Sequence, residues 1–120
     1  WDVVLFRTGY LSLWPDTEAL AAHRTPGPDI SVARWLLERG VVAAGSDTET
    51  FEVQPAPDPG PEGNPQPVHN ALIIENGVYI LESVDLEELA RRKVYEFCFV
   101  ALPLKIRGAT GSMVDPVAIY

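Results

Sequence analysis

Apolar residues gather in short runs along the chain, and the pattern within each run predicts its structure. Runs that are β-branched, or that alternate apolar and polar residues, are typical of strands. One apolar stretch instead repeats every three to four residues, which is typical of a helix. The predicted strands are residues 3–6, 41–44, 78–81, 94–104 and 117–120.

The clearest predicted helix begins at Ser31, which can cap its first turn. Val32, Trp35 and Leu36 share one face, and Gly40 stands just past the end, where a left-handed residue is favoured. The strand at 3–6, this helix, the strand at 41–44 and the polar loop after it occur in the order of an α/β unit. In such units the functional loops follow the C-terminal ends of the strands. Residues 16–22 and 85–92 are also predicted helices, and residues 71–74 fit a helical turn or a strand.

Residues 55–67 hold six prolines and two glycines, a density that excludes a regular element. We interpret this segment as a surface loop within a single domain that spans residues 1–120. A loop of this length inside a compact domain can also be a lid. The chain begins with Trp1 inside a predicted strand, so we expect it to be the C-terminal portion of a larger domain.

The formal net charge is −8, which argues against nucleic-acid and anionic-membrane partners because both select clustered Lys and Arg. No apolar run approaches the roughly 20 residues of a membrane-spanning helix, and no signal peptide is visible, so we expect a cytoplasmic protein. The single cysteine, Cys98, excludes an internal disulfide and a cysteine-rich zinc site. Its alternating strand context predicts a small buried side chain.

The chain has two histidines. His23 lies in a polar stretch and is interpreted as a solvated loop residue. His69 follows the proline-rich loop and precedes an apolar segment, so it is either a hydrogen-bonded boundary histidine or a functional residue. Its candidate partner is Glu82, a carboxylate at the end of a predicted strand, and the two could share a metal ion if the intervening segment folds back.

The other acidic and aromatic candidates have simpler interpretations. The acidic residues that follow the strand at 41–44 are interpreted as a solvated charge run. Three aromatic residues are either core residues or contacts for an aromatic substrate. The acidic residues are Asp47, Glu49 and Glu52, and the aromatic ones are Tyr10, Trp14 and Phe51. No Gly-x-Ser-x-Gly, Walker or dinucleotide-binding pattern occurs, and no catalytic residue is assigned.

Several segments, in order, resemble the later half of the cyclase family, which includes bacterial kynurenine formamidases and isatin hydrolases. They are Asp-Val-Val-Leu-Phe-Arg-Thr-Gly-Tyr at 2–10, Ala-Arg-Trp-Leu at 33–36, Gly-Ser-Asp-Thr at 45–48, Gly-Val-Tyr-Ile-Leu-Glu at 77–82, and Phe-Val-Ala-Leu-Pro-Leu-Lys-Ile at 99–106.

This resemblance implies an α/β fold of the swivelling β/β/α type, usually a dimer. It implies a zinc- or manganese-dependent hydrolase of amide, formamide or lactam bonds in a small substrate, with His69 and Glu82 as metal ligands. The family's main metal motif, His-x-Gly-Thr-His-x-Asp-x-Pro, does not occur in this sequence. The remaining ligands are therefore expected from an N-terminal half of the same enzyme or from a companion chain. The alternative is a non-catalytic cyclase-like module that binds a partner or a small molecule.

Overall fold

The computed structural model describes residues 2–22 and 24–120, so His23 lies outside the described residues. The chain divides into two compact units, Trp1–Glu87 and Glu88–Tyr120. Each unit is described by itself, and the single-domain assignment stays a prediction. In the described part of the chain, no helix has the length and apolar character needed to cross a membrane.

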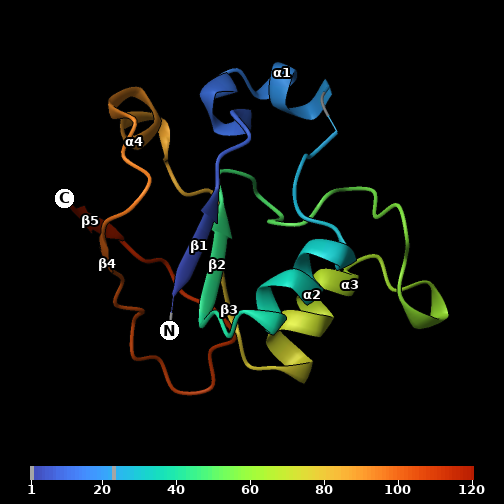
Figure 1. The fold of residues 1–120 in the computed structure, drawn as a ribbon. Coiled ribbons are helices and arrows are strands. Elements are labelled where there is room, and N and C mark those ends of the chain that lie inside the picture. The colour runs from blue at the N-terminus through green and yellow to red at the C-terminus, as the bar shows by residue number, and fades with distance from the viewer. Residues whose placement is uncertain (1, 23) are drawn as a thin grey trace. The chain divides into compact units, whose positions relative to one another are not determined.

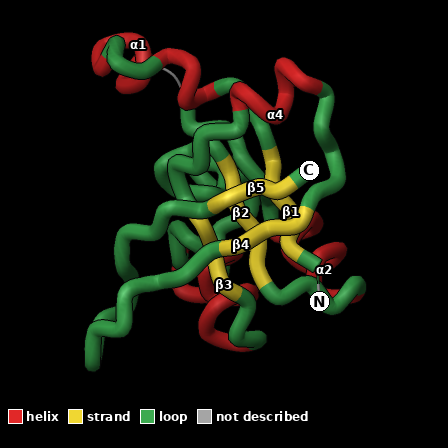
Figure 2. The backbone as a smooth tube through the Cα atoms, turned by 90° about the vertical axis from the view of Figure 1, so that its left-hand side faces the viewer, coloured by secondary structure: helices red, strands yellow, loops and turns green. Residues whose placement is uncertain are grey.

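The first unit contains a parallel sheet of three strands in the order β1 (Val3–Phe6), β2 (Ala43–Ser46) and β3 (Tyr79–Leu81) (Figures 1 and 2). β2 is the central strand, and all four of its residues are buried. Gly45 of β2 leaves room for the side chains of the two neighbouring strands. A Cβ at this position would lie 2.9 Å from the Leu5 side chain and 3.0 Å from that of Leu81. The mixed α/β class predicted from the sequence is thus confirmed.

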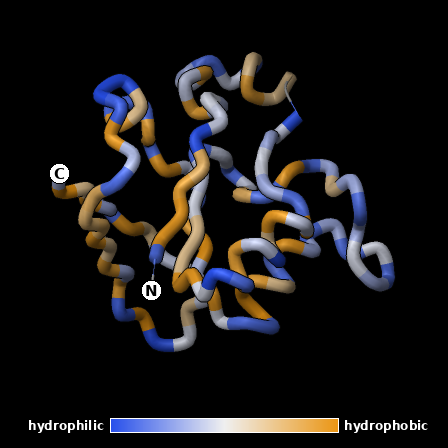
Figure 3. Tube along the Cα trace, viewed as in Figure 1, coloured by the Kyte–Doolittle hydropathy of each residue, from blue (hydrophilic) through white to orange (hydrophobic). Residues whose placement is uncertain are grey.

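The helical segments of this unit are mostly short. They are η1 (Tyr10–Leu13), α1 (Thr17–Ala22), α2 (Ile30–Glu38), η2 (Pro61–Gly63), α3 (Pro67–His69) and the π-helix η3 (Asn70–Glu75). α3 continues directly into η3, so residues 67–75 form one helical segment beside α2 (Figure 1). Within residues 55–66, η2 is the one helical turn, a departure from the prediction of no regular element, and Pro67 begins α3. The stretch is mostly hydrophilic to intermediate in hydropathy (Figure 3).

Helix α2 differs from its sequence prediction in its cap and in its buried face. Asp29, not Ser31, is the N-cap, and its side chain accepts hydrogen bonds from the backbone N–H groups of Ser31 and Val32. Trp35 is exposed, and the Arg39 guanidinium lies 4.0 Å from the centre of its ring. The face that packs inward carries Ala33 and Leu36, both fully buried.

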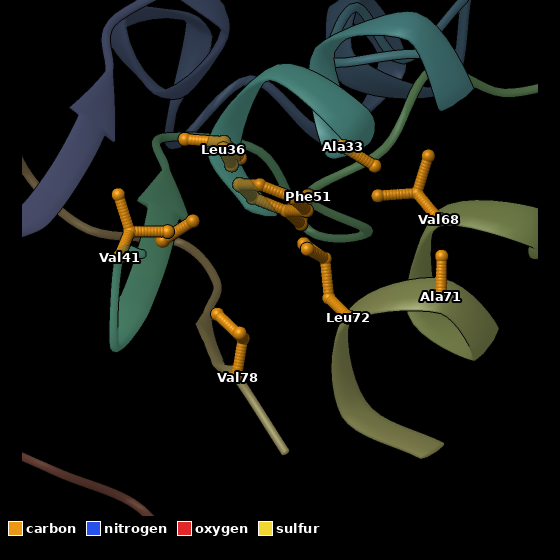
Figure 4. Close-up of a cluster of buried hydrophobic side chains, with 9 residues drawn as sticks. Ala33, Leu36, Val41, Phe51, Val68, Ala71, Leu72 and Val78 are labelled. Atoms are coloured by element: carbon orange, nitrogen blue, oxygen red, sulfur yellow. The ribbon is translucent and has the colours of Figure 1, made fainter. Parts of the chain in front are cut away.

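The core of this unit lies between the sheet and the two helical segments. Phe51 is fully buried there, near Leu36 of α2 and Leu72 of η3 (Figure 4). Its ring also meets that of Phe6 from β1, with centroids 6.2 Å apart. The core therefore ties the segment after β2 to both helices.

The second unit is small and has no buried residues of its own. It contains most of α4 (Glu87–Arg92) and an antiparallel pair, β4 (Cys98–Val100) and β5 (Val117–Ile119). The strand predicted over residues 94–104 is therefore only three residues long. Cys98 is exposed, so its predicted burial is wrong.

Candidate metal-binding site

His69 is the last residue of α3, and its backbone and ring are both held by Glu52. One carboxylate oxygen of Glu52, Oε1, accepts the backbone N–H of His69 at 3.0 Å and lies 2.5 Å from Nδ1 of the ring. The other oxygen, Oε2, accepts the backbone N–H of Val68 at 3.1 Å. Glu52 thus satisfies N–H groups in the first turn of the helix, where no intrahelical acceptor exists. The same carboxylate orients the imidazole.

Glu82 directly follows β3, and its carboxylate reaches the other side of the same ring. The distance from Glu82 Oε1 to His69 Nε2 is 3.3 Å. Ser83 has a φ of 53°, in the left-handed region, and its N–H donates to the carbonyl of Thr48 at 2.9 Å. This bond fixes the turn after β3 against the segment after β2. The Glu82 side chain is 42% exposed, so the pair faces solvent.

The structure thus brings together the two residues that the sequence analysis paired, and it adds Glu52 as a third. The interpretation of the acidic residues after β2 as a solvated run holds for Glu49 but is wrong for Asp47 and Glu52, each only 1% exposed. Glu52 was missed because a carboxylate between two apolar residues carries no local sign of a partner. Its partner lies 17 residues further along the chain.

Asp47 has a structural role near the same end of the sheet. Its carboxylate accepts the backbone N–H groups of Thr8 at 2.8 Å and Gly9 at 2.7 Å, and also the Thr8 hydroxyl at 2.8 Å. Gly9 has a φ of 86°, which a residue with a Cβ rarely adopts. Asp47 therefore fixes the turn after β1.

The three aromatic candidates lie in different environments. Phe51 is a core residue with no exposed surface, so it packs the fold and does not line a binding surface in this chain. Tyr10 is buried, and its hydroxyl donates to the carbonyl of Leu20 at 3.1 Å. Trp14 is 65% exposed. A substrate contact stays a prediction for Tyr10 and Trp14.

The arrangement of His69 and Glu82 fits part of a metal site. Two ligand atoms bound at about 2.0 and 2.1 Å to one tetrahedral zinc ion lie about 3.3 Å apart. The observed separation of Nε2 and Oε1 has this value. Over residues 2–22 and 24–120, no group of three or more His, Cys, Asp or Glu side chains is arranged to hold a metal ion. The described residues therefore offer two ligands where a catalytic site uses about three.

The fold and this site define an α/β protein with a histidine–carboxylate pair at the end of a parallel sheet. Residues 1–53 match the model of the family described as "Putative cyclase". A search of curated proteins gave no match. Among solved structures, the chain is similar to the crystal structure of "a novel cyclase", at 29% identity and a TM-score of 0.81 over 99% of this chain.

The resemblance to the cyclase family is therefore confirmed. The chain spans 40% of the length of that solved cyclase. The family match covers Glu52 but ends before His69 and Glu82.

Proposed function

We propose that this chain forms part of the site of a metal-dependent hydrolase that cleaves amide, formamide or lactam bonds in a small substrate, as kynurenine formamidase does. The observation that carries the proposal is the 3.3 Å separation of His69 Nε2 and Glu82 Oε1. With a proton on Nδ1, Nε2 presents a lone pair toward the Glu82 carboxylate, and a cation between these two atoms could bind both.

Zinc and manganese are the metals proposed, because imidazole nitrogen and carboxylate oxygen suit both. His69 and Glu82 would hold the ion. A bound divalent cation activates water and polarises the carbonyl group of an amide. The exposed side of Glu82 would leave the pair open to water and to a small substrate.

The remaining ligands are proposed to come from the rest of the enzyme or from a companion chain, since the residues that the structure describes offer two. We also propose the swivelling β/β/α fold for the complete domain, a homo-oligomeric assembly and a cytoplasmic location. Substrate recognition is proposed to involve Trp14 and Tyr10. The loop at 55–67 ends on Pro67, the first residue of α3, two residues before His69, and this closeness supports a role as a lid.

The proposal is tested by measuring bound metal and activity in the protein at its full natural length. His69→Ala and Glu82→Ala should each lower zinc or manganese content and formamide hydrolysis together, with a metal affinity at least tenfold weaker. Glu75→Ala is a matched control, because Glu75 is an exposed carboxylate on the helical segment that follows His69. Unchanged metal content in both site variants would refute the assignment.

A non-catalytic cyclase-like binding module is the second candidate function. It is favoured by the ligand count, which reaches only two in the described part of the chain. The same experiment separates the two functions. A module of this kind would bind small molecules equally well with and without metal, and it would hydrolyse no amide.

A further inference from the structure

Glu52 is a carboxylate inside the protein with only 1% of its surface exposed. Its carboxylate contacts three groups of the α3 segment: the backbone N–H groups of Val68 and His69, and the His69 ring. A helix cap needs only the two backbone contacts. The contact with the ring is the shortest of the three, at 2.5 Å, and capping does not explain it.

We propose that Glu52 is a positioning residue that fixes the tautomer and the orientation of the His69 ring, so that Nε2 is presented to Glu82 as a metal ligand. This inference rests on the proposed function. A histidine that binds a metal through one ring nitrogen typically donates the N–H of the other to a carboxylate or a carbonyl.

The protonation pattern follows from the donors around Glu52. Each of its oxygens already accepts a backbone N–H, so the carboxylate acts as an acceptor. The hydrogen in the contact with the ring then belongs to Nδ1. A neutral imidazole with its proton on Nδ1 has a lone pair on Nε2, the atom that faces Glu82.

The backbone that carries Glu52 is itself held on both sides. The N–H of Val53 donates to the carbonyl of Pro28 at 3.1 Å, and that of Gln54 donates to Thr25 at 2.9 Å. The preceding residue, Phe51, is locked in the core. This support holds the backbone from which the Glu52 side chain extends, and a group that orients a metal ligand needs such support.

The test is nitrogen-15 NMR of the histidine rings in the metal-free protein at its full natural length, at pH 8, where an ordinary imidazole is neutral. The His69 signals are assigned by their loss in His69→Gln. We expect the wild-type ring to carry its proton on Nδ1. In Glu52→Gln the side-chain amide can donate to Nδ1, and we expect a population with the proton on Nε2.

Zinc binding provides the second measurement, by calorimetric titration of zinc alone into each metal-free protein. We expect Glu52→Gln to bind zinc 10- to 100-fold more weakly than wild type. Asp47→Asn is the matched control, because Asp47 is equally buried and also accepts backbone N–H groups, but its hydrogen-bond partners are Thr8 and Gly9. It should leave the His69 tautomer unchanged.

A wild-type ring with its proton on Nε2, or a tautomer that is the same in Glu52→Gln, would overturn the inference. The wild-type spectrum alone shows which ring nitrogen carries the proton, even if Glu52→Gln fails to fold. Equal zinc affinity of wild type and Glu52→Gln would refute the positioning role and leave the proposed function standing. A correct tautomer in a wild type that binds no zinc would refute the proposed function and leave the orientation of the ring by Glu52 supported.

Discussion

Gly27 lies where the chain passes against the peptide that carries Glu52. A Cβ at this position would stand 2.1 Å from the carbonyl oxygen of Phe51 and 2.9 Å from the carbonyl carbon of Glu52. These are backbone atoms, so no side-chain rotation relieves the overlap. We expect Gly27→Ala to lower the free energy of unfolding by about 1–3 kcal/mol, the usual cost of overpacking. Urea unfolding measures it.

Gly111→Ala is the control for this substitution, since no atom beyond residue 111 and its two chain neighbours lies within 4 Å of the added Cβ. Its effect should stay within about 0.5 kcal/mol, as for an ordinary surface change. A shift of the Glu52 peptide in Gly27→Ala should also weaken zinc binding at His69. Equal unfolding curves for the two variants would contradict the claim that a Cβ at residue 27 overlaps the backbone of Phe51 and Glu52.

At the residue scale, the sequence predicted part of the candidate site. His69 and Glu82 could be paired because each stands at a boundary between an apolar run and a polar stretch, and because the resemblance supports them. Glu52 and Asp47 could not be recognised as buried. Their burial depends on backbone N–H groups that only the folded chain brings to them.

Helix α2 depends on a charged cap, which gives its stability a defined dependence on pH. The Ser31 hydroxyl, and then the Val32 N–H, donate to Asp29 and hold the pKa of this carboxyl below its usual range. The folded pKa lies below the unfolded value of about 3.9. The resulting stabilisation is therefore present above the unfolded pKa and is lost as the pH falls through the folded one.

Asp29→Ala should lower the free energy of unfolding by about 1 kcal/mol at pH 7. Asp29→Asn keeps a capping oxygen but does not titrate. We expect the stability advantage of wild type over Asp29→Asn to shrink as the pH falls below about 4. Urea unfolding at several pH values measures this difference, and an advantage independent of pH would contradict the role of the charge.

At the scale of elements, the spacing of apolar residues and the positions of glycine and proline predicted most of the helices and strands. β1 has the predicted bounds, and α2 ends before Gly40, which has the left-handed φ of 64° that its position suggested. β2 begins two residues later than predicted, because the N–H of Val41 still donates to the carbonyl of Leu36 at the end of α2. The apolar run at 94–104 is mostly unpaired, since local pattern does not specify a partner strand.

For the whole molecule, the number of ligands sets the central prediction. Two ligands bind a catalytic metal weakly, so residues 1–120 alone should show little or no hydrolysis of a formamide with zinc or manganese added. The same segment within the protein at its full natural length should be active. Comparable turnover by the segment alone would show that its two ligands suffice.

The contacts by which Glu52 holds His69 lie entirely within the protein. Because the helix is capped and the ring is contacted by residues of the fold itself, we expect these contacts to persist when the proposed metal ion is absent. This differs from small zinc domains, in which the metal drives folding. In evolutionary terms, if the proposed metal site is real, a descendant of such a protein can abandon metal chemistry while its scaffold persists, and natural selection can then adapt the surviving histidine–carboxylate pair to another use.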